Sequence, residues 1–167
     1  MNRKRHNPSA QGWHIARWPA LAWLETAIKL VAIAVGVAAF VTALSSGGAL
    51  ALPGGRRLVQ LIVLALLALG LLAAIYDRWL EREIVAMAFV LVNNLGHWGM
   101  TLALTSDTLS SGYLVAFCAL MLIGVVIKLV FLRVHAFQVR DIPRTVLFGL
   151  TSVYVVGYGV ILLLELV

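Results

Sequence analysis

The sequence has few charged residues and only one cysteine. Charged side chains occupy 12% of its 167 positions, and Cys118 has no second cysteine with which to form an intrachain disulfide. A soluble domain carries roughly twice this fraction of charge. The motifs CxxC, HExxH and GxxxxGK[ST] are also missing from the sequence, so nothing indicates a zinc site, a c-type haem or a P-loop. We therefore expect no metal ion, no cofactor and no soluble catalytic module.

Long apolar runs fill the sequence instead. Apolar residues make up 62% of it, and its mean hydropathy is +1.00. Residues 58–76 contain no charged side chain, and about 20 apolar residues suffice for a helix to cross about 30 Å of hydrocarbon. The pattern predicts an all-α, polytopic integral membrane helix bundle, in which residues 1–167 form a single transmembrane domain. The five expected transmembrane helices are 20–44, 58–76, 84–104, 113–132 and 145–164.

The distribution of lysine and arginine predicts an orientation. Cytoplasmic connections of membrane proteins are rich in these residues. With the N-terminus in the cytoplasm, the outer connections hold only Arg56 and Arg57. The cytoplasmic segments hold Arg3, Lys4, Arg5, Arg17, Arg78, Arg82, Arg133, Arg140 and Arg144. We expect a bacterial-type plasma membrane protein with its C-terminus outside. This bias also accounts for the net charge of +6, and no basic stripe with interleaved aromatic residues indicates a nucleic-acid partner.

Polar residues in the middle of an apolar span are costly and tend to have a function. At 100° per residue, one stripe of the third span holds Glu83, Met87, Val90, Asn94, His97 and Thr101, and Asn93 lies beside it. This stripe should face other helices, because an amide turned toward lipid has no hydrogen-bond partner. Gly96 and Gly99 would let a neighbouring helix come close.

The last span offers possible partners for this stripe. Tyr154 and Tyr158 are four residues apart and share a helix face with Thr151 and Glu165. We expect Asn94 and His97 to be hydrogen-bonded in the interior, through Tyr154 or Tyr158. In the first span, Glu25 and Lys29 have the i, i+4 spacing of a salt bridge, and we interpret them as an interfacial ion pair.

Two functions remain compatible with these patterns. The first is a non-catalytic subunit of a membrane complex, or a homo-oligomeric structural component, in which Asn and His only hold helices together. The small-residue pairs Ala32/Gly36 and Ala65/Ala68 would suit such contacts. The second is a small transporter, channel or proton-handling protein with Asn94 and His97 along a polar pathway, because the pKa of histidine lies near neutrality. An enzyme is the weakest hypothesis, since a single mid-membrane histidine makes a poor catalytic or metal site. The expected partners are the lipid bilayer and either other membrane subunits or further copies of the chain.

Overall fold

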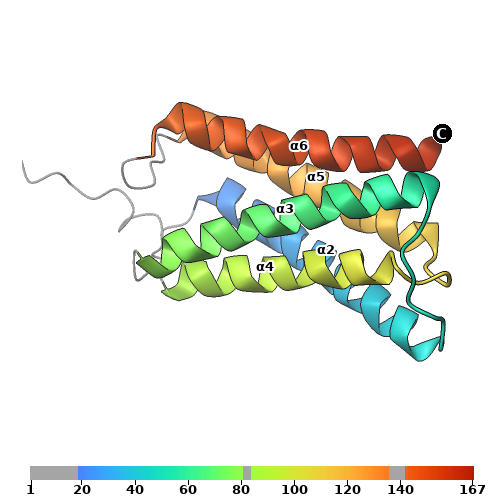
Figure 1. Ribbon diagram of the computed structural model, residues 1–167. Coiled ribbons are helices and arrows are strands. Elements are labelled where there is room, and N and C mark those ends of the chain that lie inside the picture. Colours follow the sequence, from blue (N-terminus) through green and yellow to red (C-terminus); the bar gives the residue numbers. More distant parts are fainter. Residues whose placement is uncertain (1–18, 81–83, 136–141) are drawn as a thin grey trace, which may run out of the picture.

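The part of the chain that the structure describes folds into five long α-helices joined by short connections (Figure 1). The computed structural model describes residues 19–80, 84–135 and 142–167. Within these ranges there is no β-strand, and an isolated bridge joins Leu50 and Ser106. The helices are α2 (Ala20–Ser45), α3 (Gly55–Leu80), α4 (Ile84–Ala103), α5 (Ser111–Val134) and α6 (Arg144–Leu166).

Each helix covers one of the apolar runs expected to span the membrane, with a difference at the start of α3. This helix begins at Gly55, so Arg56 and Arg57 lie in its first turn and not in the preceding connection. Both arginines find acceptors on neighbouring helices: Arg56 at the Leu164 carbonyl and Arg57 at Glu165. These partners explain why the helix extends past the apolar run to include two charged residues.

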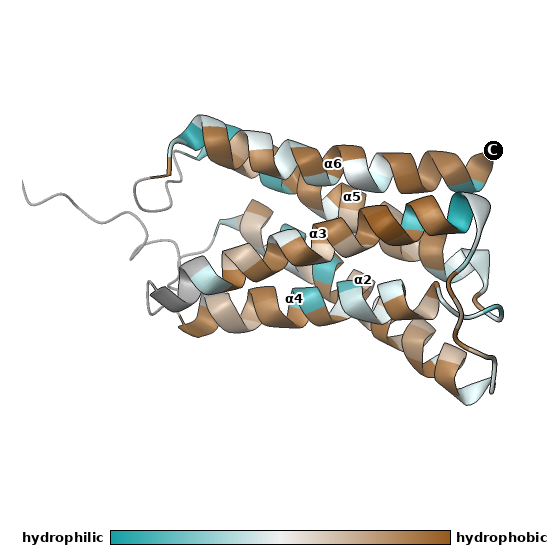
Figure 2. Ribbon diagram, in the orientation of Figure 1, coloured by the Kyte–Doolittle hydropathy of each residue, from teal (hydrophilic) through white to brown (hydrophobic). Residues whose placement is uncertain are grey.

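Four of the five helices are long and apolar enough to cross a membrane: α2, α5, α6 and residues 55–76 of α3. These four helices are compatible with an integral membrane protein. Large apolar side chains such as Leu66, Leu95 and Val156 are exposed on the outward faces, and apolar residues extend along every helix (Figure 2). Soluble monomers rarely expose contiguous apolar surface on this scale. The fifth helix, α4, is 20 residues long and carries Asn93, Asn94, His97 and Thr101.

The helices are arranged as a ring whose order differs from the order along the chain. The main packing pairs are α2 with α4, α4 with α3, α3 with α6, α6 with α5, and α5 with α2. Each helix thus has two neighbours and one face toward the interior. That interior is filled mainly by apolar side chains, among them Leu64, Phe117 and Met121.

The closest approach in the ring is between α2 and α4. A Cβ added at Gly36 of α2 would meet the backbone oxygen of Gly96 on α4. A Cβ added at Gly96 would lie 2.9 Å from the Cα of Ile33, and one at Gly99 would lie 3.0 Å from the Gly36 oxygen. The two backbones are therefore in direct contact, as small residues permit in membrane bundles.

The connections at one end of the bundle are tied together. The Ala51 N–H donates to the Thr105 carbonyl at 2.8 Å, and the hydroxyls of Ser46 and Thr108 are 2.7 Å apart. These contacts join the α2–α3 connection to the α4–α5 connection. They fix the end of the bundle at which α2 and α4 finish and α3 and α5 begin (Figure 1).

We expect Gly36→Ala to destabilise the protein, because the added methyl group would overlap the Gly96 backbone. Overpacking of this kind costs about 1–3 kcal/mol. Gly149→Ala is the matched control, since a Cβ there has nothing within 4 Å and both substitutions gain the same helix propensity. Thermal unfolding in detergent, followed by circular dichroism, should show a lower midpoint for Gly36→Ala only. Equal midpoints would contradict the close approach of α2 and α4.

Candidate functional site

The main polar site lies in the interior of the ring and is centred on His97 of α4. Its side chain is completely buried. The Nδ1 atom lies 2.8 Å from the backbone oxygen of Asn93, and Nε2 is hydrogen-bonded to the hydroxyl of Tyr158 on α6. Because a carbonyl oxygen only accepts, Nδ1 carries a proton. In the neutral imidazole Nε2 is then the acceptor, and the Tyr158 hydroxyl donates to it.

The His97–Tyr158 hydrogen bond crosses the interior of the bundle. The helices α4 and α6 are not adjacent in the ring, so the bond connects opposite sides of it. Phe117 of α5 places its ring edge-on to the imidazole, with the ring centroids 5.3 Å apart. Three helices therefore meet at His97. Tyr158 is one of the two tyrosines expected to contact this histidine.

Tyr154, the other tyrosine, has a different partner. Its hydroxyl donates to the Leu67 carbonyl of α3 at 3.0 Å. The tyrosine rings themselves lie side by side, with their centroids 6.3 Å apart. Helix α6 is thus hydrogen-bonded to α4 through Tyr158 and to α3 through Tyr154.

The remaining polar residues of α4 are buried but differ in how they are satisfied. The Thr101 hydroxyl donates to the His97 carbonyl at 2.8 Å, a contact within the helix. Asn93 and Asn94 are 7% and 3% exposed. Their side-chain oxygens are buried and have no hydrogen-bond partner among the described residues. The expected bond from Asn94 to a tyrosine of α6 is thus not made by its side-chain oxygen. Glu83, at the start of the same stripe, lies outside the described residues.

The Glu25–Lys29 pair lies within α2. The Lys29 ammonium donates to Glu25 at 2.5 Å, and the two side chains are only 7% and 13% exposed. The lysine stem runs along Gly124 of α5, where an added Cβ would lie 3.0 Å from Lys29 Cγ. The pair is therefore packed between two helices, and its position at the membrane interface stays a prediction.

A second polar site, at the end of the bundle where α3 begins, was not expected from the sequence. Gln60 of α3 is 1% exposed and donates from Nε2 to Glu165 at 2.9 Å. Arg57 donates to the same carboxylate at 3.2 Å and to Ser111 at 2.8 Å. A single glutamine near the end of an apolar run gives little signal in a sequence. Its importance follows from the end of α6 lying beside it.

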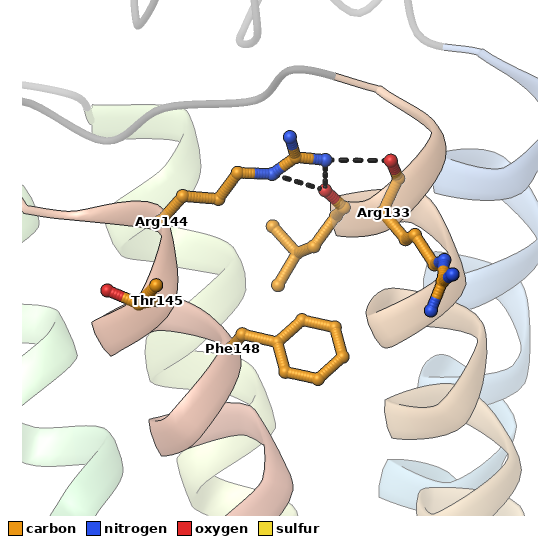
Figure 3. A pocket seen from close by; sticks show the side chains of 5 residues that line it. Arg133, Arg144, Thr145 and Phe148 are labelled. Atoms are coloured by element: carbon orange, nitrogen blue, oxygen red, sulfur yellow. Dashed lines mark hydrogen bonds between the residues drawn. The ribbon is translucent and has the colours of Figure 1, made fainter.

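The opposite end of the bundle has a groove of 310 Å³ between α5 and α6 (Figure 3). Arg144 donates from Nε to the Leu132 carbonyl at 2.9 Å and from Nη2 to the Arg133 carbonyl at 2.7 Å. These acceptors belong to the last turn of α5, where backbone carbonyls have no partner within the helix. Phe148 and Thr145 line the groove beside this contact. The groove is thus organised by a helix-capping interaction.

We expect Tyr158→Phe to destabilise the protein more than Tyr154→Phe. The first substitution leaves the buried Nε2 of His97 without a donor, and a buried unsatisfied group costs about 1–3 kcal/mol. The second only removes a donor to the Leu67 carbonyl. An average interhelical hydrogen bond in a membrane contributes about 0.6 kcal/mol. Chemical unfolding in mixed micelles would measure both changes.

A double-mutant cycle provides the control for this comparison. His97→Leu combined with Tyr158→Phe removes both partners, so the combined loss should be smaller than the sum of the single losses. Strict additivity would show that the two side chains are not coupled.

No protein-family model matches this chain, and neither a curated protein nor a solved structure matches it. Among the described residues, no group of three His, Cys, Asp or Glu side chains is arranged to hold a metal ion.

Proposed function

We propose that the protein is a non-catalytic, structural component of a bacterial-type plasma membrane, assembled with other membrane subunits or with copies of itself. The observation that supports this proposal most directly is the state of His97. Its side chain is fully buried, and both ring nitrogens have partners within the chain. Neither nitrogen is open to a solute, and Nε2 could take up a proton only if the Tyr158 hydroxyl turned from donor to acceptor. The His97–Tyr158 bond then serves to hold α4 and α6 in place.

The packing around His97 also supports a structural role. Phe117 lies beside the imidazole, and it belongs to an apolar interior in which Met100, Met121 and Leu64 are also 0% exposed. The described residues line cavities at the two ends of the bundle, at Arg144 and at Gln60. A pathway for a hydrophilic solute needs polar groups and water along its length, and this apolar filling opposes one.

A second candidate function, in proton handling or transport, is favoured by a specific observation. The side-chain oxygens of Asn93 and Asn94 are buried one turn from His97 and have no partner among the described residues. Such oxygens can accept hydrogen bonds from water or coordinate a passing cation. Under this alternative the ring would open far enough to admit water to the asparagines.

We further propose that α4 is the fifth transmembrane span of a single domain. Its 20 residues give a length of about 30 Å, the thickness of the hydrocarbon core. Its polar residues Asn94, His97 and Thr101 are buried inside the ring, and Leu91 and Leu95 are exposed outside it. The helix therefore presents an apolar surface to lipid although its composition is mixed.

The faces available to a protein partner are the apolar outer ones. Of the small residues that the sequence suggested for subunit contacts, Ala32, Gly36 and Ala68 are buried within the protomer, and Ala65 is partly buried. A subunit contact would instead use large side chains such as Leu66 and Val156, which are more than half exposed.

The structural proposal predicts that the protein isolates with stoichiometric partner chains or as a defined homo-oligomer. Extraction in a mild detergent, followed by mass spectrometry of the intact assembly, would measure this. In proteoliposomes with an internal pH dye, wild type and His97→Asn should show the same passive proton leak. His97→Asn should also unfold at a lower temperature, because it loses the bond to Tyr158.

Two results would contradict the structural proposal. One is a monomer without partners. The other is a pH-dependent proton flux that His97→Asn abolishes while Gly149→Ala, a substitution in open space on α6, leaves it intact. The second result would establish the proton-handling alternative.

For the topology, we propose a cytoplasmic N-terminus and an outer C-terminus. The arginine and lysine count supports this, although Arg3, Lys4, Arg5, Arg17, Arg82 and Arg140 lie outside the described residues. Reporter enzymes fused after Arg57, Ser111 and Val167 should all report the outer side. A cytoplasmic signal after Val167 would show that one helix does not cross.

A further inference from the structure

The second polar site encloses a cavity of 270 Å³ at the end of the bundle where α3 and α5 begin. Its lining contains two arginines, one carboxylate, an amide and a hydroxyl. The lining residues are Arg56, Arg57, Gln60, Ser111, Leu164 and Glu165. Three helices supply them: α3, α5 and α6.

The amide of Gln60 leaves an unused acceptor at this cavity. Its Nε2 lies 3.2 Å from the Ile161 carbonyl and 2.9 Å from a carboxylate oxygen of Glu165. Both of these atoms only accept hydrogen bonds, so the nitrogen must be on that side and the orientation of the amide is fixed. The oxygen Oε1 is then left buried, with no partner among the described residues.

Arg57 leaves an unused donor at the same cavity. Its Nη2 serves Ser111 and Glu165, whereas Nη1 is buried and has no partner within the described parts of the chain. Arg57 and Gln60 are three residues apart on α3 and therefore share a helix face. A buried polar group that nothing binds destabilises the folded protein. A ligand that accepts from Arg57 and donates to Gln60 would satisfy both.

The charge of the site sets the sign of that ligand. Two guanidinium groups face one carboxylate, so a positive charge is in excess. The first turns of α3 and α5 contain no acidic residue, and helix N-termini favour negative charge. Arg56 contacts the Leu164 carbonyl at 3.4 Å. This carbonyl belongs to the C-terminal end of α6, which carries a partial negative charge. A ligand with one negative charge balances the excess positive charge of the two arginines over Glu165.

We propose that this cavity binds a monoanionic phosphate group that carries or adjoins a hydroxyl. The phosphate oxygens accept from Arg57 and Arg56, and the hydroxyl donates to Gln60 Oε1. Two sources share this chemistry: the phosphoglycerol headgroup of an anionic lipid, and free dihydrogen phosphate. The site lies at a helix end, where lipid headgroups meet membrane proteins, and basic pockets between helices are known to hold such groups.

The test uses the full chain in a neutral detergent, with two pairs of probes. Intact-mass spectrometry compares retention of phosphatidylglycerol with that of phosphatidylcholine of the same acyl chains. Thermal unfolding near pH 6 compares inorganic phosphate with sulfate at equal ionic strength, because sulfate lacks the hydroxyl. We expect phosphatidylglycerol to be retained over phosphatidylcholine, or phosphate to raise the midpoint above sulfate. Lipid retention alone identifies the headgroup, and a phosphate effect alone identifies the free anion.

Variants connect the binding to the cavity. Arg57→Gln should weaken it about tenfold, as expected for loss of one charge-assisted hydrogen bond. Gln60→Met should abolish the preference for phosphate over sulfate. Arg56→Gln provides a further variant. Among the described residues Arg56 makes one long hydrogen bond, to the Leu164 carbonyl at 3.4 Å, so this variant should fold even if Arg57→Gln does not. Arg133→Gln removes the same charge at the opposite end of the bundle and should change nothing.

The proposal is overturned if wild type shows neither preference. It is also overturned if Arg56→Gln and Arg57→Gln bind as wild type does, or if Arg133→Gln weakens binding equally. None of these outcomes depends on whether the protein proves to be a structural subunit or a transporter.

Discussion

An imidazole in the interior of an apolar bundle has to find its hydrogen-bond partners within the chain, and the arrangement of the helices around it follows from this constraint. His97 meets it with two contacts, to the Asn93 carbonyl and to Tyr158. The second contact fixes the distance between α4 and α6 across the ring. Once these helices are set, Phe117 fills the space beside the imidazole, and Tyr154 is positioned to reach Leu67 of α3.

The same constraint explains why the bundle has polar residues inside and apolar residues outside. Gln60, Asn93, Asn94 and His97 are all less than one-tenth exposed. In water this distribution would be unfavourable, because the exposed leucines and valines would order water around them. In hydrocarbon it is favourable, since lipid chains cannot satisfy an amide or an imidazole. The arrangement therefore supports a membrane setting independently of the length of the helices.

The helices themselves could be predicted from the sequence, because the length of an apolar run gives the length of the membrane-spanning helix. Which helices touch could not be predicted in the same way. Gly96 and Gly99 marked a close approach, but only the structure shows that Gly36 of α2 is opposite them. Tyr158 could not be preferred to Tyr154, because the choice depends on the angle and depth at which α6 passes α4. Gln60 was missed because its partners, Ile161 and Glu165, are about 100 residues away in the sequence.

The ring order has a consequence for the way the chain is made. Two pairs of consecutive helices, α3 with α4 and α5 with α6, are also packing neighbours, so each can associate as soon as its second helix emerges from the ribosome. The first described helix, α2, has α4 and α5 as its neighbours. It must therefore remain in the membrane without either of them while α3 is synthesised. During that interval Lys29 has its counter-ion, Glu25, four residues away on the same helix. The ion pair is neutral overall, so α2 carries no isolated charge before α4 and α5 pack against it.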